Sequence, residues 1–146
     1  MAFPPFNDEG DLPPGVHSAT LSETLQHFGH GTTQRVAVAD RLNRIYHLAK
    51  STNHLARFAV FGSFVTAKDD PDDVDIIMLM GDSFDLTKVT GEAAIIFDHQ
   101  QADAHFGASI FWATRSGALG GEQAMIEHWQ LRREGGFRGI VEIVGE

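Results

Sequence analysis

The first regular pattern along the chain is one of apolar residues at helical spacing. Residues 33–52 carry apolar side chains three or four positions apart, and polar residues fill most positions between them. The recurring apolar residues are Val38, Leu42, Ile45 and Ala49. This spacing predicts a long helix over 33–52, and the capping-box pair of Thr20 and Glu23 predicts a shorter helix over 20–28.

After residue 52 the pattern changes to short apolar runs of the length of a strand. Residues 58–61 and 74–80 are two such runs, and a glycine follows each of them. Runs that are apolar throughout are typical of strands buried on both faces. The two runs are predicted to be neighbouring strands, and residues 108–113 and 140–144 are predicted to be two more.

Two later segments are assigned to helices. Residues 84–105 fit a helix or a strand by periodicity, and a helix over 93–97 is favoured because Gly107 ends the segment before the next strand. A second helix is predicted over 122–133. Its apolar side chains are Met125, Ile126 and Trp129, its last turn carries Arg132 and Arg133, and Gly135 and Gly136 follow it.

Residues 1–16 differ in composition from the rest of the chain. They contain four of the five prolines and few adjacent apolar residues, which predicts an extended N-terminal arm laid over a core. Residues 17–146 are predicted to form one domain, since neither a repeat nor a linker interrupts them. Interleaved helices and strands indicate the α/β (α+β) class, with a small mixed β-sheet flanked by helices.

Composition and charge exclude several classes of function. The 146 residues include 11 Lys and Arg against 20 Asp and Glu, and the net charge of −9 disfavours nucleic acid as a partner. The lack of cysteine excludes disulfides, iron–sulfur clusters and thiol nucleophiles. No apolar run approaches the roughly 20 residues of a membrane helix, and the N-terminus lacks a signal-peptide pattern. We therefore expect a cytoplasmic protein without a membrane partner.

The candidate chemistry lies between the two buried strands. Gly62 and Ser63 follow the first strand, and Asp73 and Asp75 stand at the start of the second. A glycine lets a ligand approach the backbone closely, and a serine offers a hydroxyl and an amide donor, which are groups that hold phosphate. Side chains two apart in a strand point to the same face, so the two carboxylates project together and favour a divalent cation.

The identity of the cation follows from the donor atoms. Hard oxygen ligands without a nearby His or Cys favour Mg²⁺ or Mn²⁺ over zinc. A calcium loop is excluded because Pro71 interrupts the alternating acids. The five acids of residues 69–75 could instead form a solvated, purely structural loop. Asp75 argues against this alternative, because a charged group inside an apolar run requires a partner.

The spacing of these residues resembles that of a known superfamily. Gly62-Ser63, nine further residues and then Asp73-x-Asp75 in an apolar strand are similar to the signature of the nucleotidyltransferase superfamily with the DNA polymerase β-like fold. FNDEGDLPPGVH near the start and FRGIVEIV near the end resemble the borders of a small bacterial family of uncharacterised nucleotidyltransferase-like proteins. The resemblance implies that Gly62 and Ser63 contact a nucleoside triphosphate and that Asp73 and Asp75 bind magnesium.

The resemblance also implies an activity, and one position departs from it. Active members transfer a nucleoside monophosphate to an acceptor hydroxyl and release pyrophosphate. They usually carry a third carboxylate on a later strand, where this chain has Ser109. Serine is a poor metal ligand and no general base at neutral pH. Asp98, Asp103 or Glu142 could supply the missing carboxylate from another direction.

Two functions are therefore expected. The first is magnesium-dependent transfer of a nucleoside monophosphate to a hydroxyl of a protein or small molecule. The alternative is a catalytically degenerate fold that binds a nucleotide, or a protein partner as in a toxin–antitoxin pair, and Ser109 motivates it.

Basic residues and histidines supply further candidates. Lys68 is the favoured additional phosphate contact, because it lies in the loop between the Gly-Ser turn and the acids. Helix-terminal or surface roles are favoured over phosphate contacts for the arginines at 35, 115, 132, 133 and 138. The histidine pairs His27–His30 and His99–His105 lack a recognised metal-ligand spacing, which favours ordinary surface or hydrogen-bonding roles.

Overall fold

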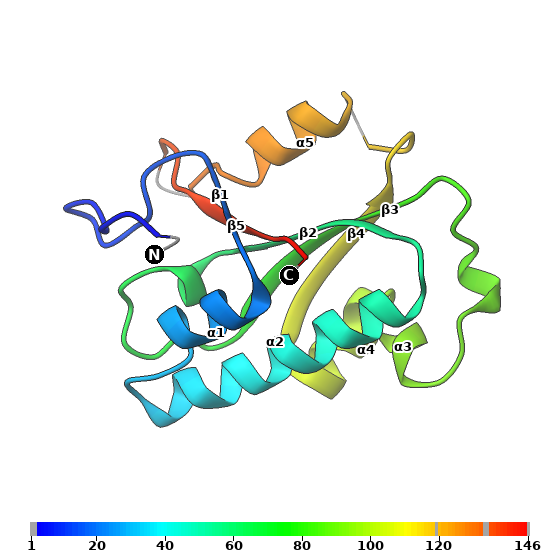
Figure 1. The fold of residues 1–146 in the computed structure, drawn as a ribbon, viewed down its shortest axis with the longest axis horizontal. Coiled ribbons are helices and arrows are strands. Elements are labelled where there is room, and N and C mark those ends of the chain that lie inside the picture. The colour runs from blue at the N-terminus through cyan, green and yellow to red at the C-terminus, as the bar shows by residue number, and fades with distance from the viewer. Residues whose placement is uncertain (1–2, 119, 133–134, 146) are drawn as a thin grey trace.

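A mixed five-stranded β-sheet forms the centre of the protein (Figure 1). The computed structural model describes residues 3–118, 120–132 and 135–145. In sheet order the strands are β1 (Val16–Ala19), β5 (Ile140–Ile143), β2 (Leu55–Phe61), β3 (Val74–Met80) and β4 (Ala108–Thr114). β1 is parallel to β5 and β3 to β4, whereas β2 is antiparallel to both β3 and β5. The predicted class, a single α/β domain with a small mixed sheet, is confirmed.

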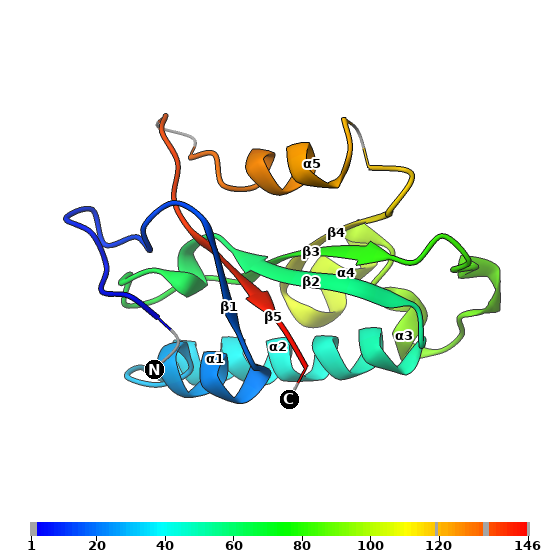
Figure 2. The same ribbon diagram turned by 45° about the horizontal axis from the view of Figure 1, so that its top comes forward.

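Helices cover both faces of the sheet. They are α1 (Leu21–Phe28), α2 (Thr33–Ser51), α3 (Glu92–Ile95), α4 (His99–Phe106) and α5 (Glu122–His128), with short 3₁₀ turns η1 (Ser63–Val65) and η2 (Leu86–Lys88). Figure 2 shows α1 and α2 on one side of the sheet and α5 on the other. Among the described residues, no helix combines the length and the apolar character needed to cross a membrane.

Strand β3 is buried on both faces, which explains its nearly continuous apolar sequence. The side chains that pack in the main core, with those of α1 and α2, are Val74, Ile76, Met78 and Met80. Ile77 points to the opposite face and packs with Ile126 of α5 in a smaller cluster. Because side chains alternate between faces along a strand, Asp75 shares the face of Ile77. The candidate site therefore lies on the α5 side of the sheet.

Both N-terminal helices form where they are predicted, α1 from its capping box and α2 from its apolar spacing. Thr20 caps α1, because its Oγ1 accepts a hydrogen bond from the backbone N–H of Glu23 at 3.1 Å. The Glu23 carboxylate in turn accepts the backbone N–H of Thr20 at 2.9 Å, which completes the predicted capping box. Thr32 caps α2 through the backbone N–H of Arg35 at 3.1 Å.

The prediction of one helix over 122–133 is wrong in length. Helix α5 ends at His128, and the chain then turns back on itself. The turn contains Gly135 and Gly136, whose φ angles of 99° and 77° lie in a region that favours glycine. Arg132 therefore lies outside the helix, and Arg133 lies outside the described residues.

Two other elements differ from expectation. The helix favoured over 93–97 is a single turn, α3, and the separate helix α4 follows it. Asp98 divides the two as the N-cap of α4, where its Oδ1 accepts the backbone N–H of Gln101 at 3.0 Å. The hydrophobic pattern does not predict strand β1, because this strand is short, mixes polar and apolar residues and depends on pairing with β5.

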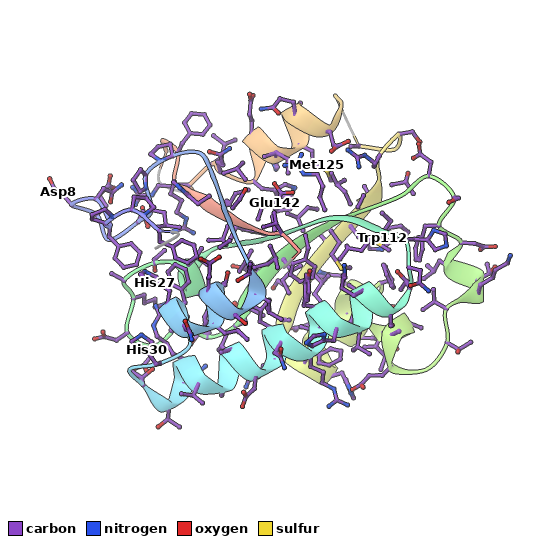
Figure 3. The ribbon with its side chains drawn as sticks, viewed as in Figure 1. Asp8, His27, His30, Trp112, Met125 and Glu142 are labelled. Carbon is purple, nitrogen blue, oxygen red and sulfur yellow. The ribbon has the colours of Figure 1, made fainter. Side chains whose placement is uncertain are left out.

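The N-terminal segment packs on the domain. Residues 3–15 contain no helix or strand, and Phe3 and Leu12 are buried in the main core. The ring centroid of Phe3 lies 4.9 Å from that of Phe28 and 4.7 Å from that of His27. His27 and His30 lie near this contact, at the end of α1 (Figure 3).

We expect stability to fall as His27 is protonated. Burial lowers the pKa of His27 below its ordinary value of 6.5, and the nearby His30 lowers it further. The unfolded chain therefore takes up a proton at higher pH than the folded chain, so stability is lost as the pH falls through about 6.5. Between about pH 7.5 and 5.5, the free energy of unfolding measured with denaturant should fall more for the wild type than for His27→Gln. Equal losses would contradict this.

Candidate functional site

The strand ends that carry the candidate residues meet at one end of the sheet. β2 ends at Phe61, directly before Gly62 and Ser63. β3 and β4 begin at the same end, because β3 runs antiparallel to β2 and parallel to β4. Phe61 pairs with Asp75 in the register, and Asp75 pairs with Ser109 of β4. Three strands therefore bring the Gly-Ser turn, the acidic pair and Ser109 together.

The two aspartates belong to one face of this sheet end. Asp73 precedes β3, and its Oδ2 accepts a hydrogen bond from Ser109 Oγ at 3.1 Å. Because Ser109 is the register neighbour of Asp75, this bond places the Asp73 carboxylate on the face that carries Asp75. Both aspartates are partly exposed. The structure thus has the juxtaposition of acids that the two-residue spacing predicts.

Gly62 is required by its backbone conformation and by the space beside it. Its φ of 77° and ψ of −162° fall in a region that is open essentially to glycine alone. A Cβ atom built on Gly62 would lie 1.9 Å from Oδ2 of Asp75. The Asp75 carboxylate therefore packs directly against the Gly62 backbone, and the Gly-Ser turn is in contact with the acidic pair.

The loop after the Gly-Ser turn is held by the buried side chain of Arg35. The residue is 8% exposed, and its Nη1 donates to the carbonyls of Phe28 at 3.0 Å and Phe64 at 2.8 Å. Its Nη2 donates to the Thr66 carbonyl at 2.6 Å, and its Nε to the Lys68 carbonyl at 3.1 Å. Burial lowers the pKa of this guanidinium, which Asp69 and Asp70 partly offset. Arg35 is therefore a structural residue of the loop.

A cleft of about 580 Å³ opens beside these groups. It is lined by Gly62, Ser63, Asp75 and Ser109, by the aromatic residues Phe61, Phe111 and Trp129, by the basic residues His128, Arg132 and Arg138, and by Leu131. Pockets of a few hundred cubic ångströms hold small-molecule ligands and cofactors. The cleft thus combines oxygen ligands, basic side chains and an aromatic wall at one end of the sheet.

The aromatic wall is a part of the site that the sequence analysis missed. The ring centroid of Trp129 lies 4.8 Å from that of Phe61 and 4.7 Å from that of Phe111. Phe111 stands two residues after Ser109 in β4, and therefore on the same face. Period-two spacing from Ser109 could have indicated Phe111, whereas the position of Trp129 depends on the turn after α5.

A larger hollow, of about 1120 Å³, lies elsewhere, along α2 and α4. Three of its side chains interact with one another: Glu92 accepts from Arg44 at 2.6 Å and lies 3.0 Å from His105. Of Gly62, Ser63, Lys68, Asp73 and Asp75, none lines this hollow. We therefore place the candidate site in the smaller cleft, which Gly62, Ser63 and Asp75 line. Asp73 does not line it but is hydrogen-bonded to the lining residue Ser109.

Several other candidates lie apart from the cleft lining. Lys68 is exposed and does not line the cleft. Of the possible replacements for a third carboxylate, Asp98 caps α4 and Asp103 borders the larger hollow. Glu142 lies beneath α5 (Figure 3), where its two oxygens accept hydrogen bonds from Arg57 Nε and Nη2, both at 2.8 Å. None of these three acids lines the cleft.

The donor atoms at this end of the sheet fit a hard cation. In the described ranges, no group of three or more acidic or histidine side chains is placed to hold a metal ion. The protein ligands of a bound magnesium ion would thus be the carboxylates of Asp73 and Asp75. Magnesium commonly takes only one or two carboxylates and completes its shell with water and phosphate oxygens. The residues present therefore fit Mg²⁺ or Mn²⁺ together with a phosphate ligand.

The fold and the cleft define a mixed α/β domain with an acidic, aromatic and basic pocket at one end of its sheet. The chain belongs to a family of unknown function (DUF6932), which matches residues 4–144. Comparison with curated proteins and with solved structures gives no significant match.

We expect Gly62→Ala to destabilise the protein more than Gly91→Ala. Gly91 is a matched control, with a φ of 67°, a ψ of −148° and nothing within 4 Å of an added Cβ. Both substitutions carry the backbone penalty of about 1–3 kcal/mol, but only the one at Gly62 also collides with Asp75. Denaturant unfolding measures both losses. Equal losses would mean that the Asp75 carboxylate is not held against Gly62.

We also expect Arg35→Met to lower the free energy of unfolding by about 3 kcal/mol, because several buried carbonyl groups lose their donor. Arg35→Lys should recover only part of this loss, since one ammonium group cannot reach all four carbonyls. Arg44→Met is the control on the same helix, where the solvent-exposed pair with Glu92 contributes little to stability. Similar losses at both positions would contradict the structural role of Arg35.

Proposed function

We propose that the cleft binds a nucleoside triphosphate with Mg²⁺ and that the protein transfers the nucleoside monophosphate to a hydroxyl of a protein or small molecule. The observation that carries the proposal is the convergence of Gly62, Ser63, Asp73 and Asp75 on one face of the sheet, beside a cleft. The Gly-Ser turn before the loop and the two aspartates after it lie together, which is the arrangement that the resemblance to nucleotidyltransferases implies.

Each of these residues has a part in the proposed reaction. Asp73 and Asp75 bind the magnesium ion, which neutralises charge on the phosphates when bound. The amide and hydroxyl of Ser63 donate hydrogen bonds to phosphate oxygens, and Gly62 leaves room for the approach. The acceptor oxygen forms a bond to the α-phosphorus as the bond to the bridging oxygen breaks. Pyrophosphate leaves with that electron pair, and the acceptor proton passes to solvent.

The net charge of the chain affects which class of acceptor is favoured. A net charge of −9 repels polyanions at long range, which favours a protein or small-molecule acceptor over nucleic acid. We propose a cytoplasmic location for this reaction, because nucleoside triphosphates and Mg²⁺ are available there.

A second candidate function is binding without turnover, either as a nucleotide-binding protein or as the partner-binding half of a toxin–antitoxin pair. The hydrogen bond from Ser109 Oγ to Asp73 favours it. Ser109 pairs with Asp75 in the register. If the resemblance holds, this is the position of the third carboxylate of active nucleotidyltransferases, and a serine does not deprotonate an acceptor at neutral pH.

Asp73→Asn and Asp75→Asn test the proposed site. Each should weaken magnesium-dependent binding of triphosphate in titration calorimetry, and each should lower transfer of labelled nucleotide to a cell extract by about 100-fold or more. Asp72→Asn is the matched control, because it makes the same change on an exposed neighbour and should leave both readouts intact.

The outcomes separate the two functions. Label transfer and pyrophosphate release that require both aspartates support the enzyme. Binding that requires both, without pyrophosphate release, supports the second candidate. Transfer or binding that neither substitution changes would exclude this cleft as the site.

A further inference from the structure

A buried carboxylate of the N-terminal segment lies behind two arginines of the cleft wall. Asp11 is 4% exposed. Its Oδ1 lies 3.6 Å from Nη1 of Arg138, and its Oδ2 lies 3.5 Å from Nε of Arg132. Both arginines line the cleft. Burying a carboxylate costs free energy unless a cation pairs with it, and the two arginines provide that pairing. The question is what the arrangement does for the arginines.

The two arginines differ in what else they contact. Arg132 also pairs with Glu9 at the surface. Within the described part of the chain, the guanidinium of Arg138 pairs with Asp11 and makes no hydrogen bond. The Arg138 side chain is 29% exposed and lines the same cleft as Ser63. It is therefore a cation with donors available to a ligand.

The backbone around Arg138 is fixed on both sides. Its N–H donates to the carbonyl of Gln130 at 2.8 Å, and the N–H of Gly139 donates to the carbonyl of Leu12 at 2.9 Å. A Cβ atom on Gly139 would lie 2.3 Å from the carbonyl oxygen of Pro13, so the N-terminal segment passes directly behind this position. The segment thus supplies both the backbone support and the buried counter-charge of Arg138.

We propose that Arg138 binds the phosphates of the ligand and that Asp11 is its positioning residue, which makes the N-terminal segment a part of the binding site. The guanidinium fork matches phosphate oxygens and can donate two parallel hydrogen bonds. Ser63 lines the same cleft and would donate to the phosphates directly, whereas Asp75 and its neighbour Asp73 would act through the bound cation. This inference rests on the proposed function, since it takes a nucleoside triphosphate as the ligand.

The test measures binding to the full chain by titration calorimetry, in the presence of Mg²⁺, with three probes: ATP, inorganic tripolyphosphate and adenosine. Arg138→Gln should weaken the binding of ATP and of tripolyphosphate by about tenfold, which is typical of the loss of one charge-assisted contact, and should leave adenosine binding unchanged. Arg138→Lys should recover part of the affinity because it restores the charge without the fork.

Asp11→Asn should weaken phosphate binding less than Arg138→Gln, by about threefold, because the arginine stays but is oriented less well. Arg115→Gln is the control, since Arg115 pairs with Glu122 outside the cleft and should bind all probes like the wild type. Thermal unfolding of each variant identifies any that fail to fold.

Each part of the inference can fail separately. If folded Arg138→Gln binds both phosphate probes like the wild type while Asp75→Asn does not bind them, the inference is overturned and the proposed function stands. If Asp11→Asn lowers only thermal stability, the positioning role of Asp11 is overturned. If the wild type binds neither phosphate probe, the proposed function fails, and this inference fails with it.

Discussion

The geometry of the cleft depends on the hydrogen bonds of one buried guanidinium. Arg35 donates to the carbonyl that ends α1 and to carbonyls along the loop of residues 64–68, which has only a single 3₁₀ turn of its own. The N-terminal segment adds a bond from the N–H of Ala67 to the carbonyl of Gly10 at 2.8 Å. Because Ser63 begins this loop, a network remote from the cleft determines where the serine donors stand.

Strand β3 shows how an otherwise apolar strand accommodates a carboxylate. Asp75 lies over a glycine that provides the space, beside a serine, at the end of the sheet that α5 leaves open. The shortness of α5 matters here, because the chain turns after residue 128 and brings Trp129 and Arg138 to the rim. Had the helix continued to residue 133, as its apolar spacing predicts, this rim would be built differently.

The sequence predicts what local periodicity and spacing determine. The two long apolar patterns specify α2 and β3, and Asp73 and Asp75 are found together because they are two residues apart. The contacts between Asp11 and Arg138 join residues at opposite ends of the chain, which no local pattern encodes. Lys68 shows the limit of such reasoning: it is close in sequence to the Gly-Ser turn, but its side chain does not line the cleft.

The order of strands in the sheet has a consequence for synthesis on the ribosome. β5 lies between β1 and β2, so among the described strands β1 is joined to the rest of the sheet through β5, which is synthesised more than 100 residues later. Pairings between distant parts of a chain form slowly, and they require both partners to have left the ribosome. A nascent chain that stops before residue 138 lacks one side chain of the cleft lining, that of Arg138. The complete lining of the cleft therefore forms only after this late segment has been synthesised.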